Sequence, residues 1–292
     1  MNPILRDVLR YFVTVAALVG AFFVARWMWN RYEVEPWTRD ARLRADVIQV
    51  APDVSGPVAS VEVRDNQPVE RGQVLFVIDR ARFELALAQA ESQLASLRSE
   101  AAQAEREARR SRSLGQAIPV ETREQSLARL EQARATLERA TADRNLAALD
   151  LERSVVRSPV TGTVTNVLLQ AGDYVKAGQQ TMAVVDSSTF RVEAYFEETK
   201  LSRIAPGDPV TIHVMGESPV LRGHVESIAA GIEDRERTVS SSLLPDVNPT
   251  FSWVRLAQRI PVRIAFDEVP GGLRLIVGRT ATVNVFPRED RQ

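Results

Sequence analysis

Residues 56–79 read GPVASVEVRDNQPVERGQVLFVID, and residues 162–186 read GTVTNVLLQAGDYVKAGQQTMAVVD. Alternating apolar residues in both stretches predict short strands with one buried face, and the glycine turns in VERGQ and VKAGQ separate those strands. One copy offers about four short strands, too few for a stable core. The two copies are therefore predicted to form one small two-sheet sandwich from halves at 47–79 and 155–186. At an offset of 106 residues, the matched pairs are Gly56/Gly162, Val58/Val164, Val61/Val167, Val63/Leu169, Val69/Val175, Gly72/Gly178 and Gln73/Gln179.

Residues 80–154 separate the two copies and carry a heptad pattern. Their only helix breakers, Gly115 and Pro119, lie near the middle. Apolar seams with Arg, Glu and Gln elsewhere are typical of a coiled coil, so we expect an antiparallel helical hairpin with a turn near 115–120. Arms of roughly 33 residues would each extend about 50 Å. Arg144 is one polar break in the seam, whose other positions are Phe83, Leu87, Ala90, Leu94, Leu97, Ala101, Ala104, Ala108, Leu130, Ala133, Leu137, Ala140, Ala147 and Leu151. The charged faces either are solvated or contact neighbouring copies.

Residues 187–287 contain short runs in which apolar and polar residues alternate. Turns such as PGDP at 206–209 separate these runs. This pattern predicts a small antiparallel barrel or sandwich. Residues 233–250 are charged and then rich in Ser and Pro, which indicates a long inserted loop. Residues 288–292 are expected to be a C-terminal tail.

The amino terminus carries a membrane segment. Residues 11–29 are almost entirely apolar and approach the about 20 residues that a membrane-spanning helix needs. A cleaved signal peptide is the alternative, but no A-x-A cleavage site follows. Charge is balanced around the segment, so the positive-inside rule leaves its orientation open. Residues 1–10 are then a tail, and residues 30–46 are expected to be a linker.

Composition excludes several function classes. The 37 Lys and Arg residues balance 38 Asp and Glu residues, which argues against a nucleic-acid binder. The chain has no cysteine and only two histidines, His213 and His224, which excludes disulfide scaffolds and multi-histidine or cysteine-ligated metal centres. No Walker motif is present. We expect no catalytic, cofactor-binding or metal-binding residue.

The order of these segments resembles the HlyD-type membrane fusion proteins, the periplasmic adaptors of Gram-negative efflux and secretion pumps. The motifs that carry the resemblance are the two glycine-turn repeats and LERSVVRSPVTGTV at 151–164. VEAYFEETKL at 192–201 and SWVRLAQRIPVRI at 252–264 resemble the aromatic-acid efflux adaptors, the periplasmic subunit of the p-hydroxybenzoic acid pump. The resemblance implies a mixed α and β fold: a transmembrane helix, a lipoyl-like sandwich split by a coiled-coil hairpin, and a C-terminal β-barrel.

The resemblance also implies a non-enzymatic function. The chain would be a single-pass inner-membrane protein with a cytoplasmic amino end and a periplasmic body. A ring of six copies would connect an inner-membrane aromatic-acid exporter to a TolC-type outer-membrane channel. Lipoyl carriers hold their cofactor on a lysine at the joint of the two halves. Here the helical hairpin occupies that joint and Lys176 lies in another turn, so no covalent cofactor is expected.

The hairpin tip is the candidate site for contact with the channel. Adaptors that dock TolC-type channels resemble the pattern Arg-x3-Leu-x6-Ser at this place. Arg110 and Leu114 fit the first two positions, whereas the serine position falls on Glu121, or on Pro119 if the turn is two residues shorter. Gly115, Ile118 and Pro119 complete the candidate docking residues.

Trp253 and Arg255, in SWVRLAQR, are candidates for a transporter or barrel interface, with core packing as the alternative. The sequence is also compatible with other functions. The chain could serve a multidrug or protein-secretion system, or it could be a structural spacer of the envelope.

Overall fold

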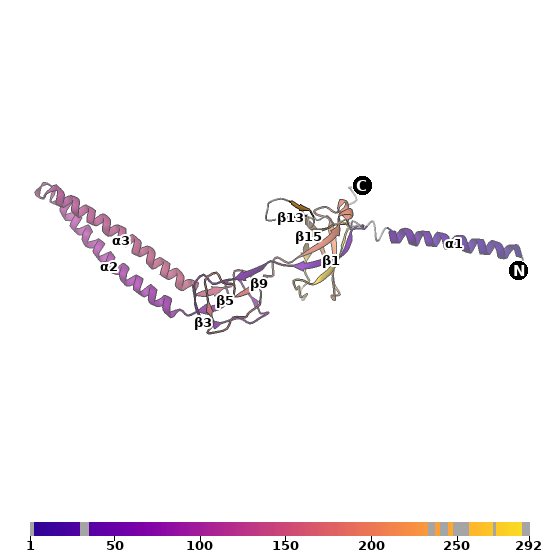
Figure 1. Ribbon diagram of the computed structural model, residues 1–292, viewed down its shortest axis with the longest axis horizontal. Coiled ribbons are helices and arrows are strands. Elements are labelled where there is room, and N and C mark those ends of the chain that lie inside the picture. Colours follow the sequence, from indigo (N-terminus) through magenta and orange to yellow (C-terminus); the bar gives the residue numbers. More distant parts are fainter. Residues whose placement is uncertain are drawn as a thin grey trace. The chain divides into compact units, whose positions relative to one another are not determined.

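The computed structural model describes residues 3–29, 35–232, 237–239, 245–247, 257–270 and 273–287. The predicted fold class is confirmed: the chain contains an amino-terminal apolar helix, a closed β-barrel, a two-sheet sandwich and a long helical hairpin (Figure 1). The chain divides into two compact units. One contains residues 1–45 and 189–292, and the other contains residues 46–188.

The sandwich has two four-stranded sheets, and each sheet takes strands from both sequence repeats. One sheet has the order β2-β9-β7-β4 and the other has the order β6-β5-β3-β8. The strands of the first sheet are β2 (Val47–Val50), β9 (Met182–Asp186), β7 (Gly162–Thr165) and β4 (Pro68–Val69). Those of the second are β6 (Val155–Arg157), β5 (Val74–Ile78), β3 (Gly56–Val61) and β8 (Tyr174–Val175).

The sequence repeat makes one sheet the counterpart of the other. Exchanging each strand for its repeat partner (β2 with β6, β3 with β7, β4 with β8 and β5 with β9) converts the first strand order into the second. The hydrogen bonds follow the same exchange: Asn66 N donates to Val164 O at 2.9 Å, and Gly172 N donates to Val58 O at 2.8 Å. The sandwich therefore has approximate twofold symmetry, and neither half has a sheet of its own.

The repeated glycines at 56 and 162 allow the strands to approach closely. A Cβ atom on Gly162 would lie 2.0 Å from the backbone oxygen of Val185, and one on Gly56 would lie 2.7 Å from a methyl group of Ile78. Around these contacts, Leu75, Phe76, Ile78, Val164 and Val184 are fully buried.

The barrel has six antiparallel strands in the closed order β1-β10-β15-β12-β11-β16. Alternate side chains point inward and form an apolar core around Leu43, Phe196, Ile212 and Ile264. The strands are β1 (Trp37–Arg44), β10 (Arg191–Glu197), β15 (Arg259–Glu268), β12 (Val220–Ile228), β11 (Pro209–Val214) and β16 (Thr280–Val285).

Two segments differ from the sequence expectations. The expected linker at 30–46 contains strand β1, which pairs with β10 and β16 and completes the barrel. Within the expected loop at 233–250, β13 (Arg237–Val239) pairs with β14 (Pro245–Val247). A short 3₁₀ helix, η3 (Glu198–Arg203), follows β10.

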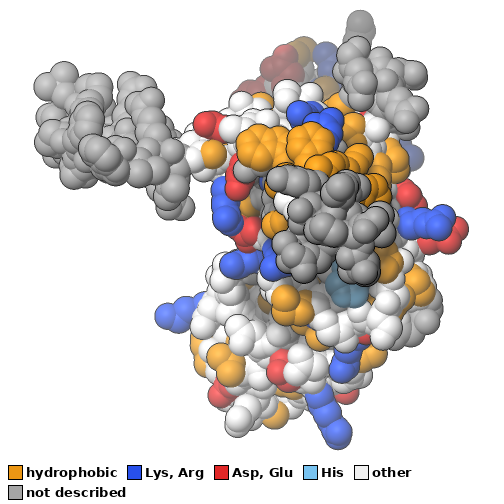
Figure 2. All heavy atoms as spheres, turned by 90° about the vertical axis from the view of Figure 1, so that its right-hand side faces the viewer, with side chains coloured by type: hydrophobic (Ala, Val, Ile, Leu, Met, Phe, Trp, Pro, Cys, Tyr) orange, Lys and Arg blue, Asp and Glu red, His pale blue; other side chains and the backbone are white. Residues whose placement is uncertain are grey.

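The first helix, α1, runs from Pro3 to Trp29. Within it, Phe12–Trp29 is the one stretch among the described residues that is long and apolar enough to cross a membrane. Its side chains from Phe12 onward are exposed, and Figure 2 shows hydrophobic side chains gathered where this helix faces the viewer. A helix that is apolar on every side and buries nothing in its own chain fits a lipid environment.

Candidate functional site

The hairpin is formed by α2 (Ala81–Ser113) and α3 (Val120–Arg153), which run side by side (Figure 1). The seam follows the heptad spacing, with Ala101, Ala108, Leu130 and Ala140 buried between the helices. Small alanine side chains let the two helices approach closely, and the longer leucines fill the space between them. The seam thus holds two arms of 33 and 34 residues together.

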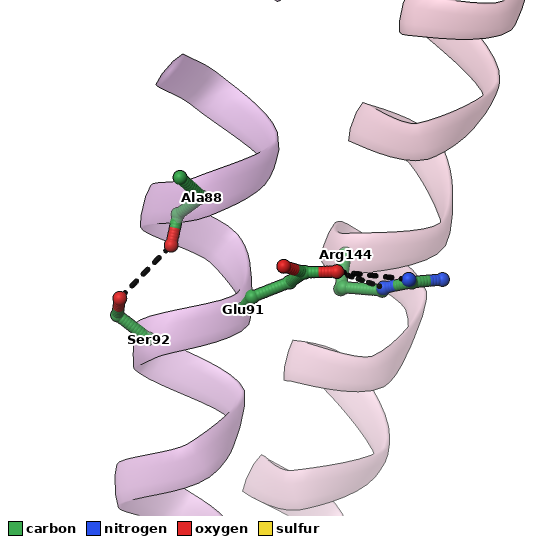
Figure 3. Close-up of polar contacts among 4 residues, drawn as sticks. All are labelled: Ala88, Glu91, Ser92 and Arg144. Carbon is green, nitrogen blue, oxygen red and sulfur yellow. Dashed lines mark hydrogen bonds and ion pairs between the residues drawn. The ribbon is translucent and has the colours of Figure 1, made fainter. Parts of the chain in front are cut away.

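The one polar seam residue that the sequence showed in α3, Arg144, is paired. Its Nη2 and Nε atoms donate to Glu91 Oε1 across the two helices at 2.9 and 3.2 Å (Figure 3). A second cross-helix pair joins Arg134 to Glu105 at 3.8 Å. All four side chains are partly exposed, so each pair contributes at most about 1 kcal/mol and mainly favours the correct register.

The base of the hairpin is fixed in the sandwich. Phe83 is buried in the sandwich core, and Leu151 packs against the same core. Arg82 Nη2 donates to Ser55 O at 2.8 Å, and Arg153 forms an ion pair with Asp53 at 3.4 Å. Both arms therefore start from the packed part of this unit.

The tip is a tight turn made by the predicted breakers. Leu114 directly follows α2 as its C-cap and donates its N–H to Arg110 O at 3.1 Å. A short 3₁₀ helix, η2 (Gly115–Ala117), follows, with Gly115 at φ +51°. Ile118 is extended, and Pro119 immediately precedes α3. Proline is suited to this place, because no helical hydrogen bond needs its missing N–H.

Three of the five predicted tip residues line one pocket of about 260 Å³ between the helix ends: Arg110, Leu114 and Ile118. Gly115 and Pro119 form the turn beside it. The remaining lining residues are Glu107, Ser111, Thr122, Gln125, Ser126 and Arg129. The pocket therefore combines two apolar side chains with three hydroxyls, one amide, one carboxylate and two guanidinium groups.

Ser111 is the tip residue that the sequence reasoning missed. Its side chain is 8% exposed, and its Oγ atom has no hydrogen-bond partner in the structure. The signal was present in the seam spacing, because 111 is the next seam position after 104 and 108. The seam thus ends at the tip in a polar residue.

The other predicted interface residues, Trp253 and Arg255, lie outside the described residues. The described chain resumes at Ala257, which together with Gln258 and Arg259 borders an open groove of about 840 Å³ on the barrel surface. Tyr195 and Arg42 also line this groove, and Arg259 is paired with Asp40 there.

His213 and His224 both lie exposed on barrel strands, and His224 Nδ1 contacts Asp267 Oδ1 at 2.6 Å. Within the described part of the chain, no group of three His, Asp or Glu side chains is placed to hold a metal ion.

Two family models match the folded units. Residues 46–187 match the RND MFP barrel-sandwich hybrid domain, and residues 189–286 match the AAEA-like beta-barrel domain. The uncharacterized protein YdhJ of Escherichia coli (strain K12) is 40% identical over 278 residues, which cover 95% of this chain and 98% of that protein.

Solved structures share the fold. The membrane fusion protein Spr0693 from Streptococcus pneumoniae R6 has a TM-score of 0.64 and 17% identity, covering 85% of this chain and 97% of that one. A MacA–MexA chimera containing the Pseudomonas aeruginosa MexA α-hairpin domain has a TM-score of 0.58 and 21% identity. The match covers 88% of this chain and 83% of the chimera. The two domain models adjoin with only residue 188 between them, and the E. coli relative matches almost end to end. The chain belongs to the membrane fusion protein family, and it is an adaptor protein rather than an enzyme.

Proposed function

We propose that this chain is the periplasmic adaptor subunit of a tripartite efflux pump, which joins an inner-membrane transporter to a TolC-type outer-membrane channel. The observation that carries the proposal is the long hairpin inserted in a sandwich of the membrane fusion protein family, behind one apolar helix. Arms of 33 and 34 residues extend about 50 Å. A helical arm of that length suits contact with a partner outside the inner membrane.

The apolar helix supports the proposed location. Phe12–Trp29 anchors the chain in the inner membrane as a single span, with the amino end in the cytoplasm and the barrel, sandwich and hairpin in the periplasm. Arg26 at the end of the span can extend to the interface. The bacterium is Gram-negative in this proposal, because the partner channel lies in an outer membrane.

Several copies are needed to enclose a conduit, and we infer a ring of six from the family resemblance. A helix is only about 10 Å wide, so one hairpin cannot form a tube. The exposed arginines and glutamates on α2 and α3 supply opposite charges for contacts between neighbouring hairpins.

The proposed cargo is aromatic carboxylic acids such as p-hydroxybenzoate. The support is that both segments similar to aromatic-acid efflux adaptors, 192–201 and 252–264, fall inside the stretch that matches the AAEA-like barrel model. The transporter would then be of the aromatic-acid exporter type, with Trp253 and Arg255 in the segment that contacts it. Export of other drugs by the same architecture is the second candidate.

In the proposed assembly, the tip residues Arg110, Leu114, Gly115, Ile118 and Pro119 contact the channel. Leu114 is 48% exposed although it is a large apolar residue, and exposed apolar side chains at a helix end suit a contact with a partner.

Hairpin length can be tested separately from hairpin sequence. Deleting 88–101 and 135–148 removes two heptads from each arm and keeps both seams in phase, which shortens the hairpin by about 21 Å. We expect this variant to remain in the membrane and to co-purify with its transporter, but to lose acid tolerance in a deletion strain. A control variant restores the length with heptads of unrelated sequence and should restore export. Full export by the shortened variant would contradict the bridging function.

The cargo is tested by the deletion strain itself. We expect increased sensitivity to p-hydroxybenzoate and unchanged sensitivity to uncharged drugs, with an aromatic-acid exporter recovered by affinity purification from solubilised membranes. Increased sensitivity to drugs alone would mean that the cargo is a drug and not an aromatic acid. The adaptor function would still hold. Envelope leakage without any change in specific tolerance would favour a structural spacer.

A further inference from the structure

The pocket at the hairpin tip combines features that the docking residues alone do not explain. Ser111 closes the seam, and its hydroxyl is buried without a partner. A buried hydroxyl without a hydrogen bond costs free energy, so a partner group that reaches it would gain both a hydrogen bond and relief of that cost. Ser111 is one of the residues that line the pocket of about 260 Å³, which is large enough for one side chain.

The charge around the pocket selects the chemistry of its occupant. Residues 106–129 carry six arginines and three glutamates, a net charge of +3, whereas the whole chain carries −1. Arg110 and Arg129 line the pocket, and no ion pair holds either of them within the described residues. Glu107, the acidic residue in the lining, accepts a hydrogen bond from Gln103 Nε2 at 3.1 Å along its own helix.

The walls limit the occupant further. Leu114 and Ile118 contribute apolar surface, and Thr122 and Ser126 contribute hydroxyls. Ser126 donates its hydroxyl to Arg123 O at 2.8 Å, so it is already satisfied, unlike Ser111. An aspartate or glutamate fits this combination, because its short apolar stem contacts the walls while its carboxylate accepts from the hydroxyl and from the guanidinium groups.

We propose that this tip pocket receives one acidic side chain of the outer-membrane channel, with Ser111 as the hydrogen-bond donor at its base and Arg110 and Arg129 as the cationic rim. This inference rests on the proposed function, since it names the group by which the channel is recognised. The inference gives a binding role to Ser111, which is not one of the positions of the Arg-x3-Leu-x6-Ser pattern.

The test uses the full-length chain in detergent and the purified TolC-type channel of the same bacterium. The pocket variants are Ser111→Ala and Arg129→Gln. The matched controls are Ser113→Ala, whose hydroxyl bonds to Arg110 O on the exposed side of the same helix, and Arg139→Gln, which lies ten residues further along α3. We expect Ser111→Ala to weaken channel binding about tenfold and Arg129→Gln about threefold, with both controls within about twofold of the unaltered chain.

A merely structural role of Ser111 would give a different result. Since the hydroxyl is unpaired, Ser111→Ala should keep or raise the melting temperature of the hairpin while binding falls. A lowered melting temperature that accounts for the binding loss would overturn the proposal.

The occupant is identified from the channel side. Acidic residues at its periplasmic end are changed one at a time to the matching amide. For one of them, the loss of binding should be large with the unaltered adaptor and clearly smaller with Ser111→Ala, because the two substitutions remove the same hydrogen bond. Two results would overturn the pocket proposal and leave the proposed adaptor function intact. One is unchanged channel binding by Ser111→Ala. The other is that the effect of Ser111→Ala and the effect of each channel substitution simply multiply, for every acidic residue tested. If the unaltered chain fails to bind the channel, the proposed function fails as well.

Discussion

Arg144 on α3 places its guanidinium group against the carboxylate of Glu91 on α2, with Nη2 2.9 Å from Oε1, where the heptad pattern would place an apolar residue (Figure 3). The long aliphatic stem of an arginine can fill part of such a position while its charged end reaches solvent. The hairpin thus accepts a charge in its seam without burying it.

This arrangement predicts the order in which substitutions at Arg144 and Glu91 change the stability of the hairpin. We expect Arg144→Leu to raise the melting temperature of the hairpin, because leucine places an apolar side chain at a seam position that arginine fills only in part. Arg144→Ala should lower stability by about 1–2 kcal/mol through lost packing, and Glu91→Gln by less than about 1 kcal/mol. Thermal melts followed by the helical circular dichroism signal measure this order. Arg139→Leu on the exposed face is the control, and a lower melting temperature for Arg144→Leu than for Arg144→Ala would contradict the packing explanation.

The close approach at Gly162 predicts that alanine substitution of the two repeat-related glycines lowers the stability of the sandwich by different amounts. A Cβ on Gly162 would meet the backbone of Val185 at 2.0 Å, but one on Gly56 would meet the side-chain end of Ile78 at 2.7 Å. A methyl group can move aside more easily than a backbone carbonyl. We expect Gly162→Ala to cost about 4 kcal/mol and Gly56→Ala about 1–2 kcal/mol. Hydrogen exchange of peptides from the sandwich measures both losses of stability. The control is Gly231→Ala, because a Cβ added at Gly231 would meet no atom within 4 Å.

The buried base of the hairpin predicts a loss of local order when Phe83 is shortened. Phe83 is 7% exposed and packs in the sandwich core, so Phe83→Ala should cost about 3–4 kcal/mol. Leu85→Ala, two residues later on the exposed side of the same helix, should change stability by less than about 0.5 kcal/mol. Hydrogen exchange at residues 81–90 reports the difference. Equal exchange in the two variants would show that the hairpin does not depend on this contact.

The membrane assignment predicts the effect of a charge in the span. Leu18 is exposed near the middle of the apolar stretch, and an arginine at such a place costs about 2.5–3.5 kcal/mol of insertion free energy. We expect Leu18→Arg to move a large share of the chain from the membrane pellet to the soluble fraction after carbonate extraction. Leu18→Ile is the control and should stay in the pellet. Retention of both variants would mean that other parts of the chain hold it to the membrane.

Patterns with a regular period predicted most of the fold. The sandwich repeat was visible because its glycines and valines keep one offset through both copies, and the hairpin because its seam keeps heptad spacing over both arms. These patterns are local, and burial of one face imposes them directly.

Strand β1 could not be predicted in the same way. Its sequence, WTRDARLR, contains four charged residues, and only Ala41 and Leu43 are fully buried. It is a strand because it completes the barrel between β10 and β16, which are far away in the sequence. Such a tertiary requirement leaves almost no trace in local periodicity.

The candidate site was predicted only in part. Arg110 and Leu114 came from the resemblance to a tip pattern and Ile118 from its place in the predicted turn, and the structure places all three around one pocket. Ser111 was overlooked because a serine at a helix end is unremarkable in sequence. Its importance depends on the opposite helix, which buries it and leaves its hydroxyl without a partner.

The interleaved sheets of the sandwich bear on how this architecture can evolve. Each repeat supplies strands to both sheets, so the core closes mainly between residues 47–79 and 155–186, and the hairpin adds to it only near its base, with Phe83 and Leu151. Heptads can therefore be gained or lost in the insert without reworking the core that carries it. In the proposed adaptor, the reach of the hairpin can follow the width of the periplasm by small, separate mutational steps, while the fold at its base is inherited unchanged.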